Sequence, residues 1–241
     1  MKIIRPIALS IVVIFTMIQS EGQSPTITKL RMELANAKTD SCRLPILDSL
    51  DIYYLFCSDQ IDSSFFYANE SIETAFPLND KRPLTLSYAR MGSYFYFVGK
   101  YGAALQILNK AISLSEQTNF YNYSSFIYLT IAELYTFLNQ FNKAKTYLDK
   151  AEYYLQFGED PFYNIQARTF MAYSITYLSN GELDSASLYF HKVEESLNGH
   201  TDFVSEDLYL GWMAMLKSNL KKYQEAKQFS LEGIEAIKRN A

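Results

Sequence analysis

The sequence predicts an all-α protein, a right-handed α-α superhelix of about five helix–turn–helix repeats. Three observations predict this fold: a small residue that recurs about every 40 positions, apolar residues three and four positions apart, and prolines that lie between the repeats. Five copies at so steady a period are typical of helical hairpins that stack on one another.

The second helix of each repeat is marked by two small residues seven positions apart. The stretch GKYGAALQILNKAISLSEQ, at 99–117, contains Ala104 and Ala111 at this spacing. Seven positions are about two helical turns, so both small residues lie on one face and let a neighbouring helix approach closely. The leading small residues recur 40, 40, 42 and 40 positions apart, and they are Ser64, Ala104, Ala144, Ala186 and Ala226.

The first half of each repeat also has apolar residues at helical spacing. It contains a small residue in register, and these residues are Gly92, Ala132, Ser174 and Ala214. Pro77, Pro83 and Pro161 fall between repeats, where a helix must stop or start, and no proline interrupts a predicted helix. The predicted helices are 26–37, 44–57, 61–76, 83–98, 101–117, 122–138, 141–156, 163–179, 183–197, 203–219 and 223–239.

This pattern resembles the tetratricopeptide repeat (TPR), which has a small residue and an aromatic in its first helix and two small residues seven apart in its second. The residues that carry the resemblance are Gly92, Gly99, Tyr101, Ala104, Leu108 and Ala111 in one copy and Ala132, Tyr135, Phe141, Ala144, Leu148 and Ala151 in the next. The period near 40 exceeds the usual length of about 34 residues. The start of the chain is similar to the exported N-terminal repeat domains of membrane-bound bacterial regulators. The resemblance implies a TPR-like solenoid over 44–241, preceded by an N-terminal helix and link at 25–43.

The first 24 residues have the layout of a secretory signal peptide. Lys2 and Arg5 form a basic start, an apolar run follows at 7–18, and small residues come after it. The run is shorter than the about 20 apolar residues that span a bilayer, although an uncleaved membrane anchor remains the alternative. We therefore expect 1–24 to be a signal peptide and the protein to be exported, periplasmic or secreted, with no membrane span after signal removal.

Composition and motifs disfavour several functions. A net charge of −4 without a basic block argues against nucleic-acid binding. Cys42 and Cys57 lie at the two ends of a predicted helix, roughly 22 Å apart, so we expect two free thiols, buried or unreactive, rather than a disulfide. His191 and His200 lack metal-ligand spacing, and His191 is expected at the surface. We expect no catalytic residue, cofactor or metal; an envelope hydrolase with a degenerate site is a remote alternative.

The first helices of such a superhelix line its concave groove, where the family pattern places the candidate binding residues. These candidates are Leu86, Ser93, Tyr96, Phe97, Phe126, Glu133, Phe137, Arg168, Met171, Ile175, Leu178, Met215, Ser218 and Asn219. The lining is apolar and aromatic with a few polar side chains, which suits a peptide or a partner helix that docks apolar anchors. The alternative is that these residues pack on one another as core.

Two functions remain open: a non-catalytic scaffold that binds proteins in the cell envelope, and the sensory or regulatory repeat domain of a membrane-bound signalling protein whose output half is missing from this chain. The last predicted helix contains Phe229, Ile234 and Ile237. We therefore expect its face to be covered, either by a second copy, in a homodimer, or by sequence outside this chain. A small tolerated patch is the alternative.

Overall fold

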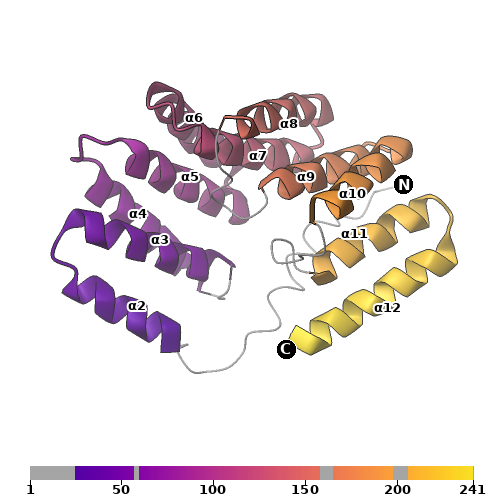
Figure 1. The fold of residues 1–241 in the computed structure, drawn as a ribbon, viewed down its shortest axis with the longest axis horizontal. Coiled ribbons are helices and arrows are strands. Elements are labelled where there is room, and N and C mark those ends of the chain that lie inside the picture. The colour runs from indigo at the N-terminus through magenta and orange to yellow at the C-terminus, as the bar shows by residue number, and fades with distance from the viewer. Residues whose placement is uncertain (1–24, 57–59, 158–164, 198–205, 241) are drawn as a thin grey trace. The chain divides into compact units, whose positions relative to one another are not determined.

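The computed structural model describes residues 25–56, 60–157, 165–197 and 206–240, and these residues form eleven α-helices and no strand (Figure 1). The helices are α2 (Pro25–Asn36), α3 (Asp40–Phe56), α4 (Ile61–Ala75), α5 (Arg82–Phe97), α6 (Tyr101–Gln117), α7 (Tyr121–Phe137), α8 (Phe141–Leu155), α9 (Ile165–Ser179), α10 (Leu183–Leu197), α11 (Glu206–Asn219) and α12 (Tyr223–Asn240). The predicted all-α class is confirmed, and most predicted ends lie within a residue of these bounds.

Helix α3 begins at Asp40, four residues before its predicted start, so Pro45 is its sixth residue instead of its second. The prediction that no proline interrupts a helix is therefore wrong here. Pro45 is the sixth residue of α3, past the N–H groups that have no partner at a helix start, so the missing N–H of Pro45 removes the hydrogen bond that would reach the Ser41 carbonyl. The start is held by Thr39, whose Oγ1 accepts a hydrogen bond from the backbone N–H of Cys42 at 3.3 Å.

The chain divides into two compact units, Met1–Tyr123 and Ser124–Ala241. In the first unit α3 packs on α4 and α5 packs on α6, while α2 contacts α3 and α4 contacts α5. In the second unit α9 packs on α10 and α11 on α12, while α8 contacts α9 and α10 contacts α11. Each unit is thus a stack of helical hairpins, in which the second helix of one hairpin contacts the first helix of the next.

The turn between the two helices of a hairpin has the same backbone form in four repeats. Its left-handed residue has φ of 77°, 57°, 81° and 60° at Gly99, Asn139, Gly181 and Lys221. In the first of these turns the N–H of Gly99 donates to the Tyr96 carbonyl at 3.1 Å, and the N–H of Lys100 donates to the Phe95 carbonyl at 2.8 Å. This Schellman pattern satisfies the last carbonyls of the first helix and sets the direction of the second.

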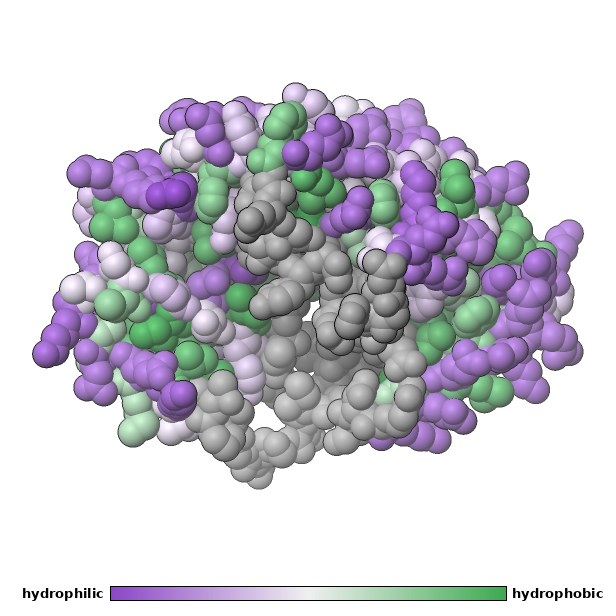
Figure 2. Space-filling model, viewed as in Figure 1, coloured by the Kyte–Doolittle hydropathy of each residue, from purple (hydrophilic) through white to green (hydrophobic). Residues whose placement is uncertain are grey.

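The small residues that define the repeat are buried in equivalent places. The second-helix pairs Ala104 and Ala111, Ala144 and Ala151, and Ala186 and Val193 are all fully buried, and Ala226 is 9% exposed. The predicted period therefore marks the packed faces of the hairpins. Hydrophilic side chains cover much of the periphery in the view of Figure 2, with hydrophobic ones scattered among them.

Several predictions fall on residues outside the described ones: the signal peptide at 1–24, Cys57, Pro161 and His200. Of the two cysteines, Cys42 is described, and its free thiol is exposed rather than buried. Among the helices that the structure describes, none combines the length and the hydropathy that a bilayer span requires.

Candidate interaction surface

The first helices of the second unit contain a row of partly accessible side chains at equivalent positions of the repeat. Glu133 on α7, Ile175 on α9 and Met215 on α11 are 42 and 40 positions apart, and all three are half-buried. The hydroxyls of Thr136 and Thr176 lie 2.7 Å apart and join α7 to α9. The first helices of these two hairpins are therefore neighbours, and their equivalent positions belong to one surface.

Arg168 on α9 reaches across to α7. Its guanidinium carbon lies 5.6 Å from the ring centroid of Phe126, within the range of a cation–π contact. Phe126 is only 4% exposed, so the ring is a fixed support for the guanidinium. Glu133 lies two turns after Phe126 on α7. Burial raises the pKa of Glu133, and the positive charge of Arg168 opposes that rise. This surface therefore holds one cation and one partly desolvated carboxyl beside apolar side chains.

The candidate residues divide into a buried and an accessible group. Four are core residues with 4–6% exposure, as the alternative interpretation expects: Ser93, Phe126, Met171 and Leu178. Eight are half-buried: Leu86, Tyr96, Phe97, Glu133, Phe137, Arg168, Ile175 and Met215. Ser218 and Asn219 are exposed at the end of α11. We define the first-helix surface of the second unit by its half-buried members, which are Glu133, Phe137, Arg168, Ile175 and Met215.

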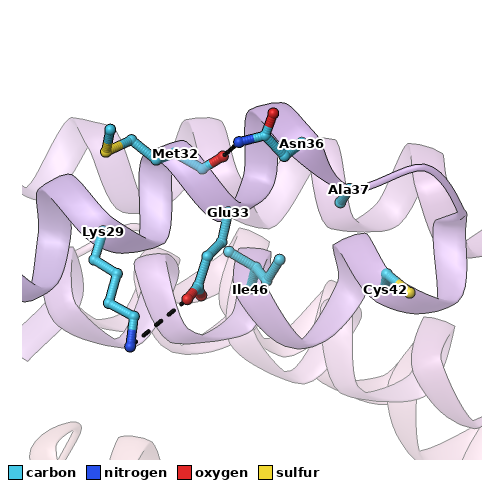
Figure 3. Close-up of a pocket in the computed structure, with 7 residues that line it drawn as sticks. All are labelled: Lys29, Met32, Glu33, Asn36, Ala37, Cys42 and Ile46. Carbon is cyan, nitrogen blue, oxygen red and sulfur yellow. Dashed lines mark hydrogen bonds and ion pairs between the residues drawn. The ribbon is translucent and has the colours of Figure 1, made fainter.

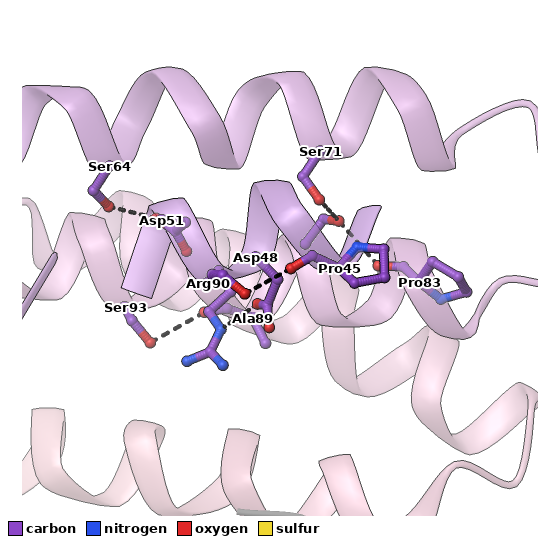
Figure 4. A network of polar contacts seen from close by, with 11 residues as sticks. Pro45, Asp48, Asp51, Ser64, Ser71, Pro83, Ala89, Arg90 and Ser93 are labelled. Carbon is purple, nitrogen blue, oxygen red and sulfur yellow. Dashed lines mark hydrogen bonds and ion pairs between the residues drawn. The ribbon is translucent and has the colours of Figure 1, made fainter. Parts of the chain in front are cut away.

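A polar network that was not predicted from the sequence joins α3, α4 and α5 in the first unit (Figure 4). The Nε of Arg90 donates to Oδ1 of Asp48 at 3.0 Å, and the arginine side chain is only 7% exposed. Asp51, one turn further along α3, is 1% exposed, and the hydroxyl of Ser64 donates to its Oδ1 at 2.6 Å. Its Oδ2 has no hydrogen-bond partner in the part of the chain that the structure describes.

Burial raises the pKa of Asp51 to about 7, while the Ser64 hydrogen bond and the charge of Arg90 lower it. The sequence did contain a signal for this network. Arg90 is a single charge within the apolar stretch LSYARMGSYFYFV, and a buried arginine requires an acidic partner. Its partner lies 42 positions away, which no local pattern indicates.

A shallow hollow of ≈ 390 Å³ lies on α2 and α3 (Figure 3). It is lined by Lys29, Met32, Glu33, Asn36, Ala37, Cys42 and Ile46. The ammonium of Lys29 lies 3.8 Å from the Glu33 carboxylate, and the amide of Asn36 donates to the Met32 carbonyl. These polar groups pair within α2 itself, so they do not converge on a shared ligand position.

His191 lies at the surface of α10, as predicted, and its Nδ1 is 3.1 Å from Oε2 of Glu194. Across the described ranges, no three His, Cys, Asp or Glu side chains are grouped so that they could hold a metal ion. Five of the eight half-buried candidate residues lie on the first-helix surface of the second unit.

A family model described as the SusR N-terminal TPR domain matches residues 21–205. No curated protein matches the chain. Among solved structures the chain is similar to BtubC (BKLC) from P. vanneervenii, with TM-score 0.64 and 13% identity over 98% of this chain and 91% of that one. It is also similar to a putative kinesin light chain of Podosopora anserina with nearly identical TPR-like repeats, with TM-score 0.58 and 15% identity over 84% of this chain and 97% of that one. At these identities the likeness shows the fold, and it confirms the TPR-like solenoid.

Proposed function

Because the chain belongs to the SusR N-terminal TPR domain family, we propose that it is a non-catalytic module that binds a protein or peptide along its first helices. The observation that carries this proposal is the row of half-buried side chains at equivalent positions, Glu133, Ile175 and Met215. Equivalent positions on neighbouring repeats form continuous binding surfaces in solenoid proteins. The family and the fold support protein interaction as the general function.

The chemistry of this surface indicates the kind of segment it binds. Phe137, Ile175 and Met215 offer apolar area that is partly open, and methionine adapts to irregular partners. Arg168 and Glu133 offer charges of opposite sign on neighbouring helices. A helix or extended peptide with apolar anchors and at least one carboxylate fits this combination, since Arg168 is already oriented by the Phe126 ring. The cell envelope is the location we propose for this interaction.

A second candidate function is the sensory or regulatory part of a membrane-bound signalling protein. The matching family model is described as an N-terminal domain, which supports a role beside further domains. The reading frame downstream of this chain tests the proposal: a following membrane span and signalling domain support it, and a stop codon contradicts it.

A photo-crosslinking experiment tests the proposed surface. The crosslinking amino acid p-benzoylphenylalanine replaces Ile175 in the full chain, which is then exposed to cell-envelope extract and irradiated. The matched control carries the same amino acid in place of Leu188, which is 56% exposed on the second helix α10. We expect a discrete crosslinked product at position 175 and none at position 188.

Substitutions then test whether the surface binds the captured partner. Phe137→Ser and Met215→Ser are expected to reduce capture strongly, because each removes apolar contact area, while Leu188→Ser leaves it unchanged. Circular dichroism must show the same helicity in all three variants. Capture that persists in Phe137→Ser and Met215→Ser, or that is equally strong at position 188, would overturn the proposal. Phe126 is unsuitable for this test because its ring is buried.

A further inference from the structure

The outer face of α12 carries a stripe of exposed residues that lies outside the first-helix surface. Its five members share about a quarter of the helix circumference, and they are Tyr223, Lys227, Leu231, Ile234 and Lys238. The three apolar members are 65%, 52% and 48% exposed at Tyr223, Leu231 and Ile234, and both lysines are exposed. We call these five residues the α12 stripe.

Two apolar positions of the equivalent stripe on α4 are partly covered, while Phe65 and Phe76, the equivalents of Lys227 and Lys238, are 40% and 64% exposed. Counted from the leading small residue of each helix, Ile61 and Ile72 correspond to Tyr223 and Ile234. Both isoleucines are partly buried and pack against a core cluster that includes Met91 of α5. The apolar residues at these two positions are therefore half-buried in the first unit, whereas their equivalents on α12, Tyr223 and Ile234, are exposed.

The equivalent positions of α8 and α10 also contact the next hairpin, through polar groups. Lys145, the equivalent of Lys227, forms an ion pair with Glu182 at 3.0 Å. Asp149, the equivalent of Leu231, accepts a hydrogen bond from the Tyr173 hydroxyl at 2.5 Å. On α10, Glu194 is the equivalent of Ile234, and it accepts a hydrogen bond from the hydroxyl of Tyr209 on α11 at 2.6 Å. The α12 stripe thus continues a helix-docking interface that three earlier hairpins use.

We propose that the α12 stripe docks an amphipathic helix of a partner protein, antiparallel to α12. Apolar residues of the partner helix contact the centre of the stripe, and its carboxylates pair with Lys227 and Lys238. The direction follows from the ion pair of Lys145, near the start of α8, with Glu182, just after the end of α9. The same position on α12 is again a lysine, so a carboxylate near the end of the partner helix has a matching cation. The proposal does not depend on the first-helix surface.

The charges favour such a partner over a second copy of this chain. Two α12 helices packed antiparallel about Leu231 and Ile234 would place Lys227 of one copy opposite Lys238 of the other. Like charges that face each other across a helix pair are unfavourable. A partner helix with acidic residues at these two places gains attraction where a second copy meets repulsion.

Fluorescence anisotropy with labelled synthetic peptides tests the inference on the full chain. The probe is an amphipathic helix of about five turns with a leucine stripe and a glutamate at each end of it. The matched control peptide has lysines in place of the two glutamates. We expect the acidic peptide to bind at least tenfold more tightly, and we expect Ile234→Ser and Lys227→Glu each to weaken its binding by about tenfold. Phe137→Ser should leave its affinity unchanged.

Other results identify other occupants and overturn the proposal. Equal affinity for both peptides, or affinity unchanged in Ile234→Ser, shows that the stripe does not dock an acidic helix. A dimer in sedimentation analysis that Ile234→Ser dissociates assigns the stripe to a second copy. Co-sedimentation with vesicles of anionic phospholipid that is lost in Lys227→Glu assigns it to a membrane surface. Both positions are exposed, so these variants are expected to keep the melting temperature of the unaltered chain, which is measured alongside.

Discussion

Leu108 of α6 packs so closely on Gly92 of α5 that a Cβ added to the glycine would lie 2.6 Å from the leucine Cγ. Leu108 is fully buried. Gly92→Ala is therefore expected to lower the free energy of unfolding by about 1–3 kcal/mol, because the Leu108 side chain or one of the two helices must shift. Urea denaturation followed by circular dichroism measures the change.

Gly102→Ala is the matched control for this substitution. Gly102 lies in the first turns of α6, is exposed, and has no heavy atom within 4 Å of an added Cβ. Alanine has the higher helix propensity, so we expect a gain of up to about 1 kcal/mol. Equal effects of the two substitutions would contradict the close contact between α5 and α6.

The buried carboxyl of Asp51 makes stability depend on pH. Its pKa rises from 3.8 to about 7 on folding, so between these values the folded state binds more protons than the unfolded state. The contribution of Asp51 to stability is therefore greatest below about pH 4, falls as the pH rises towards 7, and stays reduced above it. Asp51→Asn should remove this part of the pH dependence and stabilise the protein at pH 8 by on the order of 2–4 kcal/mol. Unfolding at a series of pH values, with the exposed Asp184→Asn as control, measures the difference in slope.

Breaking the ion pair between Arg90 and Asp48 is expected to lower the free energy of unfolding. Arg90→Gln leaves two carboxyls without their cation, so we expect a loss of about 1–3 kcal/mol at neutral pH. The same change removes a charge that lowers the pKa of Asp51, so the fall in stability should extend to higher pH. A double-mutant cycle with Asp48→Asn separates the pair from its surroundings. A coupling energy near zero would contradict the arrangement of Figure 4.

The hairpin turns predict a simple stabilising substitution. Lys221 has a positive φ of 60°, where the equivalent residues Gly99 and Gly181 are glycines. A left-handed conformation costs a residue with a Cβ about 1–2 kcal/mol, and glycine loses part of that gain to entropy. Lys221→Gly should thus raise stability by about 0.5–1 kcal/mol. Gly99→Ala should lower it by a similar amount, and thermal unfolding of both variants would reveal any departure from these opposite signs.

The proposed docking role of α12 was inferred by comparing equivalent positions of the repeat. Because Ala186 and Ala226 lie in register, the positions of α12 from Tyr223 to Ile237 have counterparts on α10. Glu194 has Tyr209 as a partner, whereas its counterpart Ile234 is exposed. The repeat thus allows a position that has a partner on the next hairpin to be compared with its apolar equivalent in the same molecule.

The sequence by itself determined the helices, their hairpin turns and the buried small residues, because these depend on neighbours within one or two turns. The seven-residue spacing of Ala104 and Ala111 and the glycine at 99 are signals of this local kind. Their places in the structure agree with the prediction, and so does the exposed position of His191.

Only the tertiary structure decided which first-helix residues are core and which are accessible, and which distant charges meet. Phe126 and Phe137 are both apolar candidates on the same predicted helix. Phe126 is buried beneath Arg168 of another hairpin, whereas Phe137 is half-buried. Arg90 finds Asp48 at a separation of 42 positions. Burial and ion pairing of this kind depend on how hairpins stack, and the free energy of that stacking comes from surfaces far apart along the chain.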